Sequence, residues 1–377
     1  MSKLKVITVL GTRPEIIRLS RVMSLFDTFF KHVIVHTGQN WDFELNEIFY
    51  KDLNLRKPDY FLDIDTSSLE SSIGDIIKKS GEVLRKEMPD ALLILGDTNS
   101  SLSAYMAKRL KIPIYHMEAG NRCFDFNVPE ETNRRILDHI SDFNLVYTEN
   151  ARRNLIAEGL PANRIYLTGS PMFEVINFYY QNIIDSNILK KVKLEKEKYF
   201  IVSIHREENV DNKKNFEVIV DVLNEISKRY NMPVIVSTHP RTKKQLSNAL
   251  LKSVEKNIKF LKPFSYSDFV NLQMNAICTI SDSGTISEES AILNFRAITI
   301  RNAMERPEAM DSGSIILTGI NKSNIIESLT ALIKMKNNKS KINIPEEYKI
   351  NNTSLRVMKL ILGTAKLSNK WNRIEKN

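Results

Sequence analysis

The chain has 377 residues, of which 42% are hydrophobic and 26% are charged. This length exceeds what one hydrophobic core usually serves, so the sequence predicts a globular protein with two domains. The formal net charge of +9 lies mostly after residue 330, where eleven Lys or Arg stand against three Asp or Glu, so the charge does not make the rest of the chain a basic, nucleic-acid-binding surface.

Short apolar runs alternate with amphipathic stretches along the first half of the chain. The stretch 73–87 has the spacing of an amphipathic helix, and the apolar runs around it have the length of buried strands. This alternation predicts a doubly wound α/β domain with a parallel sheet. The expected strands are 5–10, 32–36, 91–95, 112–116, 143–147 and 165–167.

A second alternation begins after the Gly-Ser-Pro sequence at 169–171. The charge-rich stretch 186–198 is expected to form a helix and a linker. We therefore expect a first lobe at 1–171 and a second lobe at 172–354, with an interlobe cleft. The strands expected in the second lobe are 199–204, 233–237, 258–261, 276–281, 297–300 and 314–317.

The basic tail at 331–377 is expected to be a solvated, poorly packed connection rather than a nucleic-acid-binding arm. Its four Lys residues between 334 and 341 stand among Asn and Ser, without interleaved aromatic residues that could stack on bases. Cys123 and Cys278 form no CxxC pair and have no His at ligand spacing, which indicates neither a disulfide framework nor a zinc site. No run of about eighteen apolar residues occurs, so we expect a cytoplasmic protein without a membrane span.

The phosphate-binding turns of nicotinamide and ATP sites are missing, because no glycines form G-x-G-x-x-G or the Walker pattern. Two other turns each follow a strand and open a helix. In the first, Thr12 and Glu15 have the spacing of a capping box and place Arg13 at the strand end. In the second, Ser283 and Gly284 precede a helix whose free amides could bind phosphate, although Asp-Ser-Gly is by itself more often a plain helix cap.

Acidic and basic side chains gather at the expected strand ends. Asp97 and Glu118 follow neighbouring strands, and Glu130 lies on a following loop, so the three carboxylates should converge at one crevice and could carry acid/base chemistry. Taken singly, each is more often a solvated loop residue or helix cap. A lone His is more often a structural residue. His205, however, follows a strand of the second lobe and stands beside an arginine, which favours a diphosphate as its partner.

Together these segments resemble the non-hydrolysing UDP-N-acetylglucosamine 2-epimerases along nearly the whole chain. The resemblance implies a GT-B fold of two doubly wound Rossmann-like lobes, a cytoplasmic homodimer, no metal and no cofactor, and residues 355–377 packing back on the first lobe as a helix. It rests on Gly11-Thr12-Arg13-Pro14-Glu15, His36-Thr37-Gly38-Gln39, Gly96-Asp97-Thr98, Glu118-Ala119-Gly120, Pro129-Glu130-Glu131, Asn133-Arg134, His205-Arg206, Asp282-Ser283-Gly284 and Glu305-Arg306-Pro307-Glu308-Ala309.

The resemblance also implies roles for individual residues. Asp97, Glu118 and Glu130 would transfer protons, with His205 as a further catalytic residue, while Arg18 and Arg134 line the same region. The resemblance implies that the protein binds a UDP-sugar and neither nucleic acid nor a membrane. The residues expected to bind UDP are Arg13, His205, Phe264, Ser283, Gly284, Glu289, with its carboxylate on the ribose, and Arg306.

Two departures from the family pattern concern the sugar. Arg18 stands where the UDP-GlcNAc enzymes usually have Lys, and the segment 121–125 reads Asn-Arg-Cys-Phe-Asp after Gly120, where they usually have Leu-Arg-Thr. This segment is similar to the branch that epimerises UDP-2-acetamido-2,6-dideoxy-L-talose to UDP-N-acetyl-L-fucosamine, a precursor of capsule or O-antigen. We expect that substrate, with UDP-GlcNAc as the alternative and Cys123 and Phe124 as an apolar wall for a C6 methyl group.

The expected chemistry is elimination of UDP to a 2-acetamidoglycal followed by re-addition with inversion at C2. A carboxylate can remove the weakly acidic C2 proton only if the C1–O bond breaks at nearly the same time. Three rivals remain: a GT-B glycosyltransferase, a UDP-sugar-binding protein without catalysis, and a hydrolysing epimerase. Deuterium entering C2 from solvent separates epimerisation from the first two, and release of free UDP separates it from the third.

Overall fold

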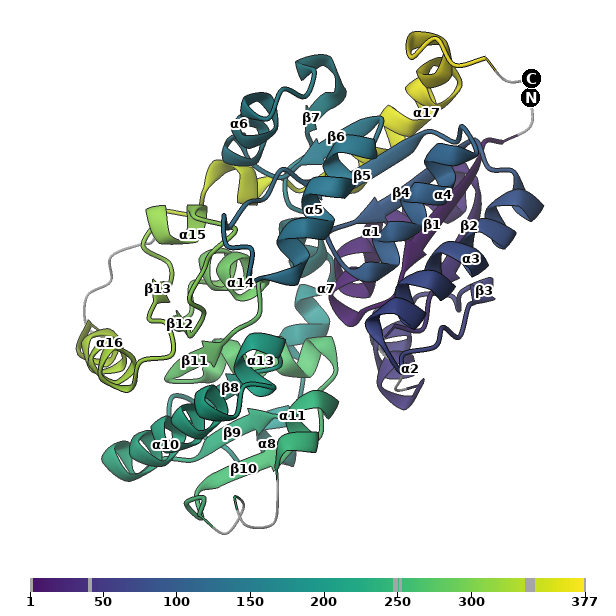
Figure 1. The fold of residues 1–377 in the computed structure, drawn as a ribbon. Coiled ribbons are helices and arrows are strands. Elements are labelled where there is room, and N and C mark those ends of the chain that lie inside the picture. Colours follow the sequence, from purple (N-terminus) through teal and green to yellow (C-terminus); the bar gives the residue numbers. More distant parts are fainter. Residues whose placement is uncertain (1–2, 40–42, 247–249, 251–252, 336–342, 376–377) are drawn as a thin grey trace. The chain divides into compact units, whose positions relative to one another are not determined.

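The computed structural model describes residues 3–39, 43–246, 250, 253–335 and 343–375, and the chain divides into two compact units (Figure 1). Unit 1 comprises Met1–Phe178 and Glu346–Asn377, and unit 2 comprises Tyr179–Pro345. These boundaries differ by several residues from the expected 171 and 354. The reason is that the first half of helix α7 (Met172–Ile184) packs with unit 1, where Glu174 accepts a hydrogen bond from the Ser354 amide at 2.8 Å.

Unit 1 contains, in its described residues, a seven-stranded parallel sheet in the order β3-β2-β1-β4-β5-β6-β7. The chain builds outward from β1 in one direction and then, from β4, in the other. The adjacent strands β1 and β4 therefore form a topological switch point, where ligands of such sheets bind. The elements are β1 (Lys5–Leu10), α1 (Arg13–Phe29), β2 (Lys31–His36), α2 (Phe43–Asp52), β3 (Tyr60–Phe61), α3 (Leu69–Glu87), β4 (Ala91–Leu95), η1 (Asn99–Leu102), α4 (Ser103–Arg109), β5 (Ile114–Ala119), α5 (Pro129–Ile140), β6 (Phe143–Val146), α6 (Glu149–Ala157), η2 (Ala162–Arg164), β7 (Ile165–Leu167), η4 (Glu346–Lys349) and α17 (Thr353–Trp371).

The sheet of unit 1 is buried on both faces, as parallel sheets are. All five residues of β4 are buried, and Val9, Leu92 and Ile114 pack in one apolar cluster with residues of α3 and α4. Helix α17 packs against α1. A hydrogen bond of 2.6 Å also joins Thr364 of α17 to Tyr115 of β5. The prediction of a poorly packed tail at 331–377 is therefore wrong for α17, whose apolar residues at helical spacing bury one face. Lys336, Lys339 and Lys341 lie outside the described residues.

Unit 2 contains, where the structure describes it, a six-stranded parallel sheet in the order β10-β9-β8-β11-β12-β13. Here β8 and β11 form the switch point, because the chain leaves β8 toward β9 and returns through β11. Its core packs β8 and β11 against α10 and α16, with Phe200, Ile280 and Ile226 fully buried. The elements are α8 (Ile188–Lys191), β8 (Phe200–Ser203), α9 (Glu207–Val210), α10 (Lys213–Tyr230), β9 (Val234–Ser237), α11 (Pro240–Gln245), β10 (Ile258–Leu261), α13 (Tyr266–Asn275), β11 (Cys278–Ser281), α14 (Ile286–Leu293), β12 (Ala297–Thr299), α15 (Glu308–Asp311), β13 (Ile316–Leu317) and α16 (Lys322–Lys334).

Two strands differ most from the sequence-based expectation, and several others differ by one or two residues at an end. The expected strand 112–116 lies at Ile114–Ala119, because Pro113 has no N–H for the ladder and the strand extends through Glu118 by a bulge. The two-residue strand β3 was not expected, since it is too short to show an apolar pattern. The stretch 186–198, expected as a helix and a linker, contains the short helix α8 followed by turns. Among the described residues, no helix is long and apolar enough to cross a membrane.

Candidate active site

Glu118 lies on a bulge at the carboxyl end of β5. The pairing of β5 with β6 shifts register between Met117 and Ala119, and Glu118 has φ +68°, in the left-handed region that residues with a Cβ rarely adopt. Such strained positions concentrate at functional sites because the surrounding structure must hold them. A Cβ placed on Gly96 would lie 3.5 Å from Glu118 Oε2, so the bulge brings this carboxylate beside the turn that carries Asp97.

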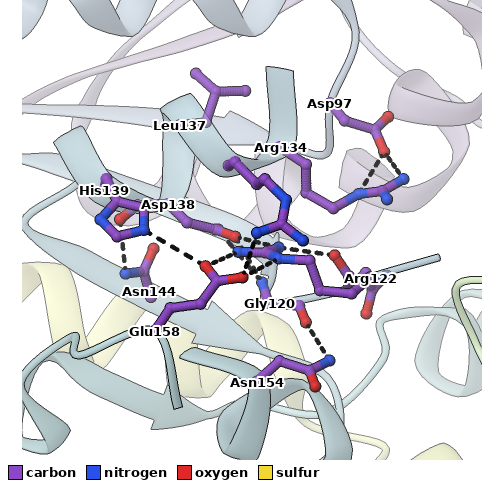
Figure 2. A network of polar contacts seen from close by, with 12 residues as sticks. Asp97, Gly120, Arg122, Arg134, Leu137, Asp138, His139, Asn144, Asn154 and Glu158 are labelled. Carbon is purple, nitrogen blue, oxygen red and sulfur yellow. Dashed lines mark hydrogen bonds and ion pairs between the residues drawn. The ribbon is translucent and has the colours of Figure 1, made fainter. Parts of the chain in front are cut away.

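Two nitrogens of Arg134 donate hydrogen bonds to one carboxylate oxygen of Asp97 (Figure 2). Arg134 donates to Asp97 Oδ2 from Nε at 3.0 Å and from Nη2 at 2.5 Å. Its Nη1 donates to Glu131 at 2.7 Å, so the guanidinium bridges two carboxylates. Asn133 reaches the same turn and donates to the Asp97 carbonyl at 3.0 Å. Because two charged N–H groups converge on Oδ2, this oxygen of Asp97 has a defined position.

Arg18 pairs with Glu118. Its guanidinium donates to Glu118 Oε2, and both side chains are almost completely buried. The same guanidinium lies 5.9 Å from the centre of the Tyr147 ring. Asn121 donates to the other oxygen of Glu118 at 3.4 Å. A buried carboxylate needs such a partner, so Arg18 positions the Glu118 carboxylate that the sequence singled out.

Glu130 is half-buried in the first turn of α5. It stands three and four residues before Asn133 and Arg134, which both contact the Asp97 turn. Residues at this spacing share one face of a helix. The fold therefore puts Glu130 on the face of α5 that points to Asp97.

A second polar network in unit 1 is centred on Arg122 (Figure 2). Arg122 donates to Asp138 at 2.7 Å and to both oxygens of Glu158 at 2.6 and 2.8 Å. The hydrogen bond from Arg122 lowers the pKa of Glu158. Gly120 is fixed as well, since Asn154 donates to its carbonyl at 3.0 Å. Arg122, which the sequence placed in a specificity segment, thus holds the fold of that segment.

The turn after β1 is closed by a capping box. Glu15 is buried and accepts the Thr12 amide at 2.8 Å, and Arg13 lies half-buried with its guanidinium 5.9 Å from the Phe49 ring centre. Burial raises the pKa of Glu15 to about 7 against the opposing effect of its hydrogen bonds. The capping-box prediction is confirmed. The depth of Glu15 in unit 1 was not predicted, because a capping box is usually exposed to solvent.

In unit 2, His205 and the turn after β11 share one buried carboxylate. Asp282 is fully buried and accepts the amides of His205 at 3.0 Å and Arg206 at 2.9 Å, and His205 Nδ1 lies 3.2 Å from Asp282 Oδ1. Burial raises the pKa of Asp282. This residue joins the carboxyl ends of β8 and β11, so it orients His205 at the switch point of the second sheet.

The start of α14 is more occupied than expected. The Ser283 amide donates to Ser281 Oγ at 3.0 Å and the Thr285 amide to Ser283 Oγ at 3.3 Å. The prediction of free amides is therefore wrong for these two residues, because neighbouring hydroxyls satisfy them locally. Gly284 lies between them, and its carbonyl accepts a hydrogen bond from Arg306 Nη1.

Glu288 and Glu289 lie in the first turn of α14, where two negative charges would repel a bound phosphate, but each has a partner within the protein. Glu288 is fully buried, 3.8 Å from Arg306 Nη1, and Glu289 accepts a hydrogen bond from Gln273 at 3.0 Å. Each carboxylate is thus oriented by a partner. Phe264 follows the carboxyl end of β10 and packs half-buried against the apolar cluster around Tyr199.

The structure thus brings the expected residues into two groups. Each group lies at or after the carboxyl ends of the strands of one sheet, and Phe264, which follows the edge strand β10, is not shown in contact with the rest of its group. Sequence reasoning missed Glu131 as a partner of Arg134, although its spacing three residues earlier on a helix is a usable signal. It also missed Asp282 as the support of His205, because only the folded chain joins these two turns. Group 1 contains Arg13, Arg18, Asp97, Glu118, Glu130 and Arg134, and group 2 contains His205, Phe264, Ser283, Gly284, Glu289 and Arg306.

Known proteins match over most of the chain. The model of the family described as UDP-N-acetylglucosamine 2-epimerase matches residues 26–362. A UDP-N-acetylglucosamine 2-epimerase of Methanococcus maripaludis is 39% identical over 340 residues, which cover 88% of this chain and 92% of that protein. The structure of UDP-N-acetylglucosamine 2-epimerase from Rickettsia bellii has 46% identity and a TM-score of 0.90, with 98% of each chain covered. That of Methanocaldococcus jannaschii UDP-GlcNAc 2-epimerase, in complex with UDP-GlcNAc and UDP, has 34% identity and a TM-score of 0.89, covering 96% of this chain and 100% of that one.

Two more distant similarities bear on the fold and on the sugar. The glycotransferase of kitacinnamycin has a TM-score of 0.59 at 9% identity, covering 96% of this chain and 99% of that one, which shows the fold alone. The fold is of the GT-B type, with two parallel-sheet Rossmann-like domains. A Pseudomonas aeruginosa protein named UDP-2,3-diacetamido-2,3-dideoxy-D-glucuronate 2-epimerase is 32% identical over 331 residues, 86% of this chain and 91% of that protein. The names share UDP and the 2-epimerase reaction but differ in the sugar.

Proposed function

Because the chain belongs to the UDP-N-acetylglucosamine 2-epimerase family and is an isomerase acting on a UDP-sugar, we propose that it inverts C2 of a UDP-activated 2-acetamido sugar with the carboxylates of group 1. The observation that carries this assignment is the placement of Asp97, fixed by Arg134, beside Glu118 on its left-handed bulge. Two oriented carboxylates at neighbouring strand ends can exchange protons with one carbon atom. Glu130, on the helix face toward Asp97, is the third proton-transfer group.

The reaction has two balanced steps. A carboxylate takes the C2 proton, the C–H electrons form the C1=C2 double bond, and the C1–O bond breaks so that its electrons leave with UDP. UDP oxygen then attacks C1 while a second acidic group delivers a proton to the opposite face of C2. No net water is consumed, so the sugar remains attached to UDP. Opposite faces of one carbon require separate proton-transfer groups, which fits the cluster of acids rather than a single one.

Group 2 supplies the nucleotide-binding side of the proposal. His205 and Arg306 present donors for the diphosphate, and His205 is oriented by the buried Asp282. Stabilising charge on the departing diphosphate lowers the barrier to elimination. Glu289, oriented by Gln273, would accept from the ribose hydroxyls. The remaining UDP contacts are assigned to Phe264, Ser283, Gly284 and, from unit 1, Arg13, with Arg18 near the sugar.

We propose UDP-2-acetamido-2,6-dideoxy-L-talose as the preferred substrate, with UDP-GlcNAc as the second candidate. The first rests on Arg18 and on the segment 121–125, in which Phe124 is 68% exposed and offers an apolar surface to a C6 methyl group. UDP-GlcNAc is supported by the similarity to UDP-N-acetylglucosamine 2-epimerases of Methanococcus maripaludis and Rickettsia bellii. The product of the first reaction would be UDP-N-acetyl-L-fucosamine, a precursor for capsule or O-antigen synthesis. The enzyme itself would be a cytoplasmic homodimer.

Nuclear magnetic resonance in deuterated buffer tests the activity and the sugar together. Incubation with each UDP-sugar should place deuterium at C2, invert that centre and release no free UDP. A glycosyltransferase or a non-catalytic binding protein would leave C2 unlabelled, and a hydrolysing epimerase would release UDP. A higher rate with UDP-GlcNAc than with the L-talo sugar contradicts the preferred substrate while leaving the epimerase activity standing.

The apolar wall has a matched pair of variants. Phe124→Ser should lower kcat/KM for the 6-deoxy sugar about fivefold, as expected for losing one apolar contact of about 1 kcal/mol. Phe126, two residues after Phe124, has a ring that is 70% exposed, and both rings lie near the Arg135 guanidinium. Phe126→Ser therefore controls for general effects on this loop. Equal losses in the two variants would reject a specific role of Phe124.

A further inference from the structure

One buried carboxylate of unit 1 joins the two turns that carry the proposed catalytic and diphosphate-binding residues. Glu15 Oε2 accepts the amides of Gly11 at 3.0 Å and Thr12 at 2.8 Å, together with the Thr12 hydroxyl at 2.7 Å. Its other oxygen, Oε1, accepts the hydroxyl of Thr98 at 3.0 Å. Both oxygens are therefore in use, and they face different turns.

The two turns belong to the two strands of the switch point. Thr12 follows β1 and directly precedes Arg13, whereas Thr98 follows β4 and is directly preceded by Asp97. The hydrogen bond between Thr98 and Glu15 thus joins the Asp97 turn to the helix start that carries Arg13. Its separation of 83 residues along the chain means that it exists only in the folded protein.

Close packing around this link leaves little room for the turns to move. A Cβ on Gly11 would lie 2.0 Å from Ser100 Oγ and 2.1 Å from Thr37 Oγ1, distances at which something must shift. Ser100 and Thr37 share a hydrogen bond of 2.7 Å, and Gln39 accepts the Ser100 amide at 3.1 Å. The turns after β1, β2 and β4 are therefore packed against one another, so a displacement of one turn is transmitted to the others.

We propose that Glu15 is a positioning residue of the 2-epimerase reaction, which acts through Thr98 to fix the Asp97 turn relative to the Arg13 turn. This inference rests on the proposed function, in which Asp97 transfers a proton and Arg13 binds the diphosphate. Glu15 itself lies below the turns and is 1% exposed, so it does not act on the sugar directly. Misplacement of a reacting group by about 1 Å can cost on the order of a hundredfold in rate, so a link of this kind has a measurable consequence.

The variant Thr98→Val tests the link, because it removes the hydroxyl and leaves Asp97, Glu15 and the bonds of Glu15 to Gly11 and Thr12 in place. We expect kcat for C2 deuterium exchange to fall at least fivefold, with KM within twofold of the parent. Thr98→Ser restores the hydroxyl and should return kcat to within twofold. The matched control is Thr330→Val in α16 of unit 2, whose hydroxyl bonds Tyr230 and the Ile326 carbonyl and which should leave kcat unchanged.

The outcomes separate this inference from the proposed function. A parent enzyme that places no deuterium at C2 contradicts the proposed function and this inference with it. An active parent with a fully active Thr98→Val variant rejects the inference alone. So does an equal loss in Thr98→Val and Thr98→Ser, because the loss would then come from packing rather than from the hydrogen bond. Hydrogen exchange of the 96–102 segment should rise in Thr98→Val and not in Thr98→Ser.

Discussion

Replacing Glu15 with Gln should remove a pH dependence of stability that is built into unit 1. Burial raises the pKa of Glu15 from 4.5 to about 7, so the folded protein binds this proton more tightly than the unfolded chain. The stabilisation is complete below pH 4.5 and is lost as pH rises through 7. A shift of about 2.5 pKa units corresponds to about 3 kcal/mol of unfolding free energy. Tyr50 faces Glu15, but burial and the nearby carboxylate raise the pKa of Tyr50 further, so it stays neutral over this range.

Urea unfolding of the parent and of Glu15→Gln at pH 4.5 to 8 measures this effect. Differences between the two proteins cancel the groups that titrate in both. Relative to the parent, the Gln variant should gain about 3 kcal/mol between pH 4.5 and pH 8. A difference between the two proteins that does not change with pH would refute the reasoning that burial dominates the environment of Glu15.

Three further substitutions have expected outcomes. Gly120→Ala should destabilise the fold by more than about 2 kcal/mol, because Gly120 has φ +81° and a Cβ there would lie 2.3 Å from the Ala151 carbonyl oxygen. Gly74→Ala is the control in the same thermal unfolding experiments: a Cβ there meets open space, so the variant should stabilise α3 by up to about 1 kcal/mol. Gly284→Ala should weaken UDP binding about tenfold in calorimetry while stability stays near that of the parent, because a Cβ there would lie 2.5 Å from Arg306 Nη1 and displace the guanidinium. An unchanged Kd would contradict a role of Arg306 in UDP binding. Gly363→Ala, where a Cβ meets open space, is the control. Arg134→Lys should lower kcat at least tenfold, since Lys has one nitrogen in place of the three with which Arg134 binds Asp97 and Glu131. A parental kcat would show that Asp97 needs no such positioning.

The sequence predicted the architecture well because it depends on local patterns. Strands 5–10, 91–95 and 258–261 were predicted with the bounds that the structure has, since each is a short, mostly apolar run. The order of the strands within each sheet was not predicted, because the alternation is compatible with more than one order. The poorly packed tail expected from charge was wrong for residues 353–371, because their charge was weighed without their helical spacing. The helix that the family resemblance implied for 355–377 overlaps α17, which lies in unit 1.

The geometry of the candidate site was predictable only in part. That Asp97 and Glu118 approach one another follows from neighbouring parallel strands. The bulge that gives Glu118 its left-handed backbone has no sequence signature, since it arises from pairing with β6. Likewise, the partners Glu131 and Asp282 are common acidic residues whose roles depend on distant segments. Tertiary contacts, rather than propensities, decide these positions.

The most direct measurement of the central claim compares C2 deuterium exchange with UDP binding in three carboxylate variants. Asp97→Asn, Glu118→Gln and Glu130→Gln should each lower the exchange rate at least a hundredfold, as expected when a positioned acid or base is lost. Their Kd for UDP should stay within about threefold of the parent, because the donors assigned to the diphosphate are elsewhere. Exchange at near-parental rates in all three variants would contradict the assignment of proton transfer to these carboxylates.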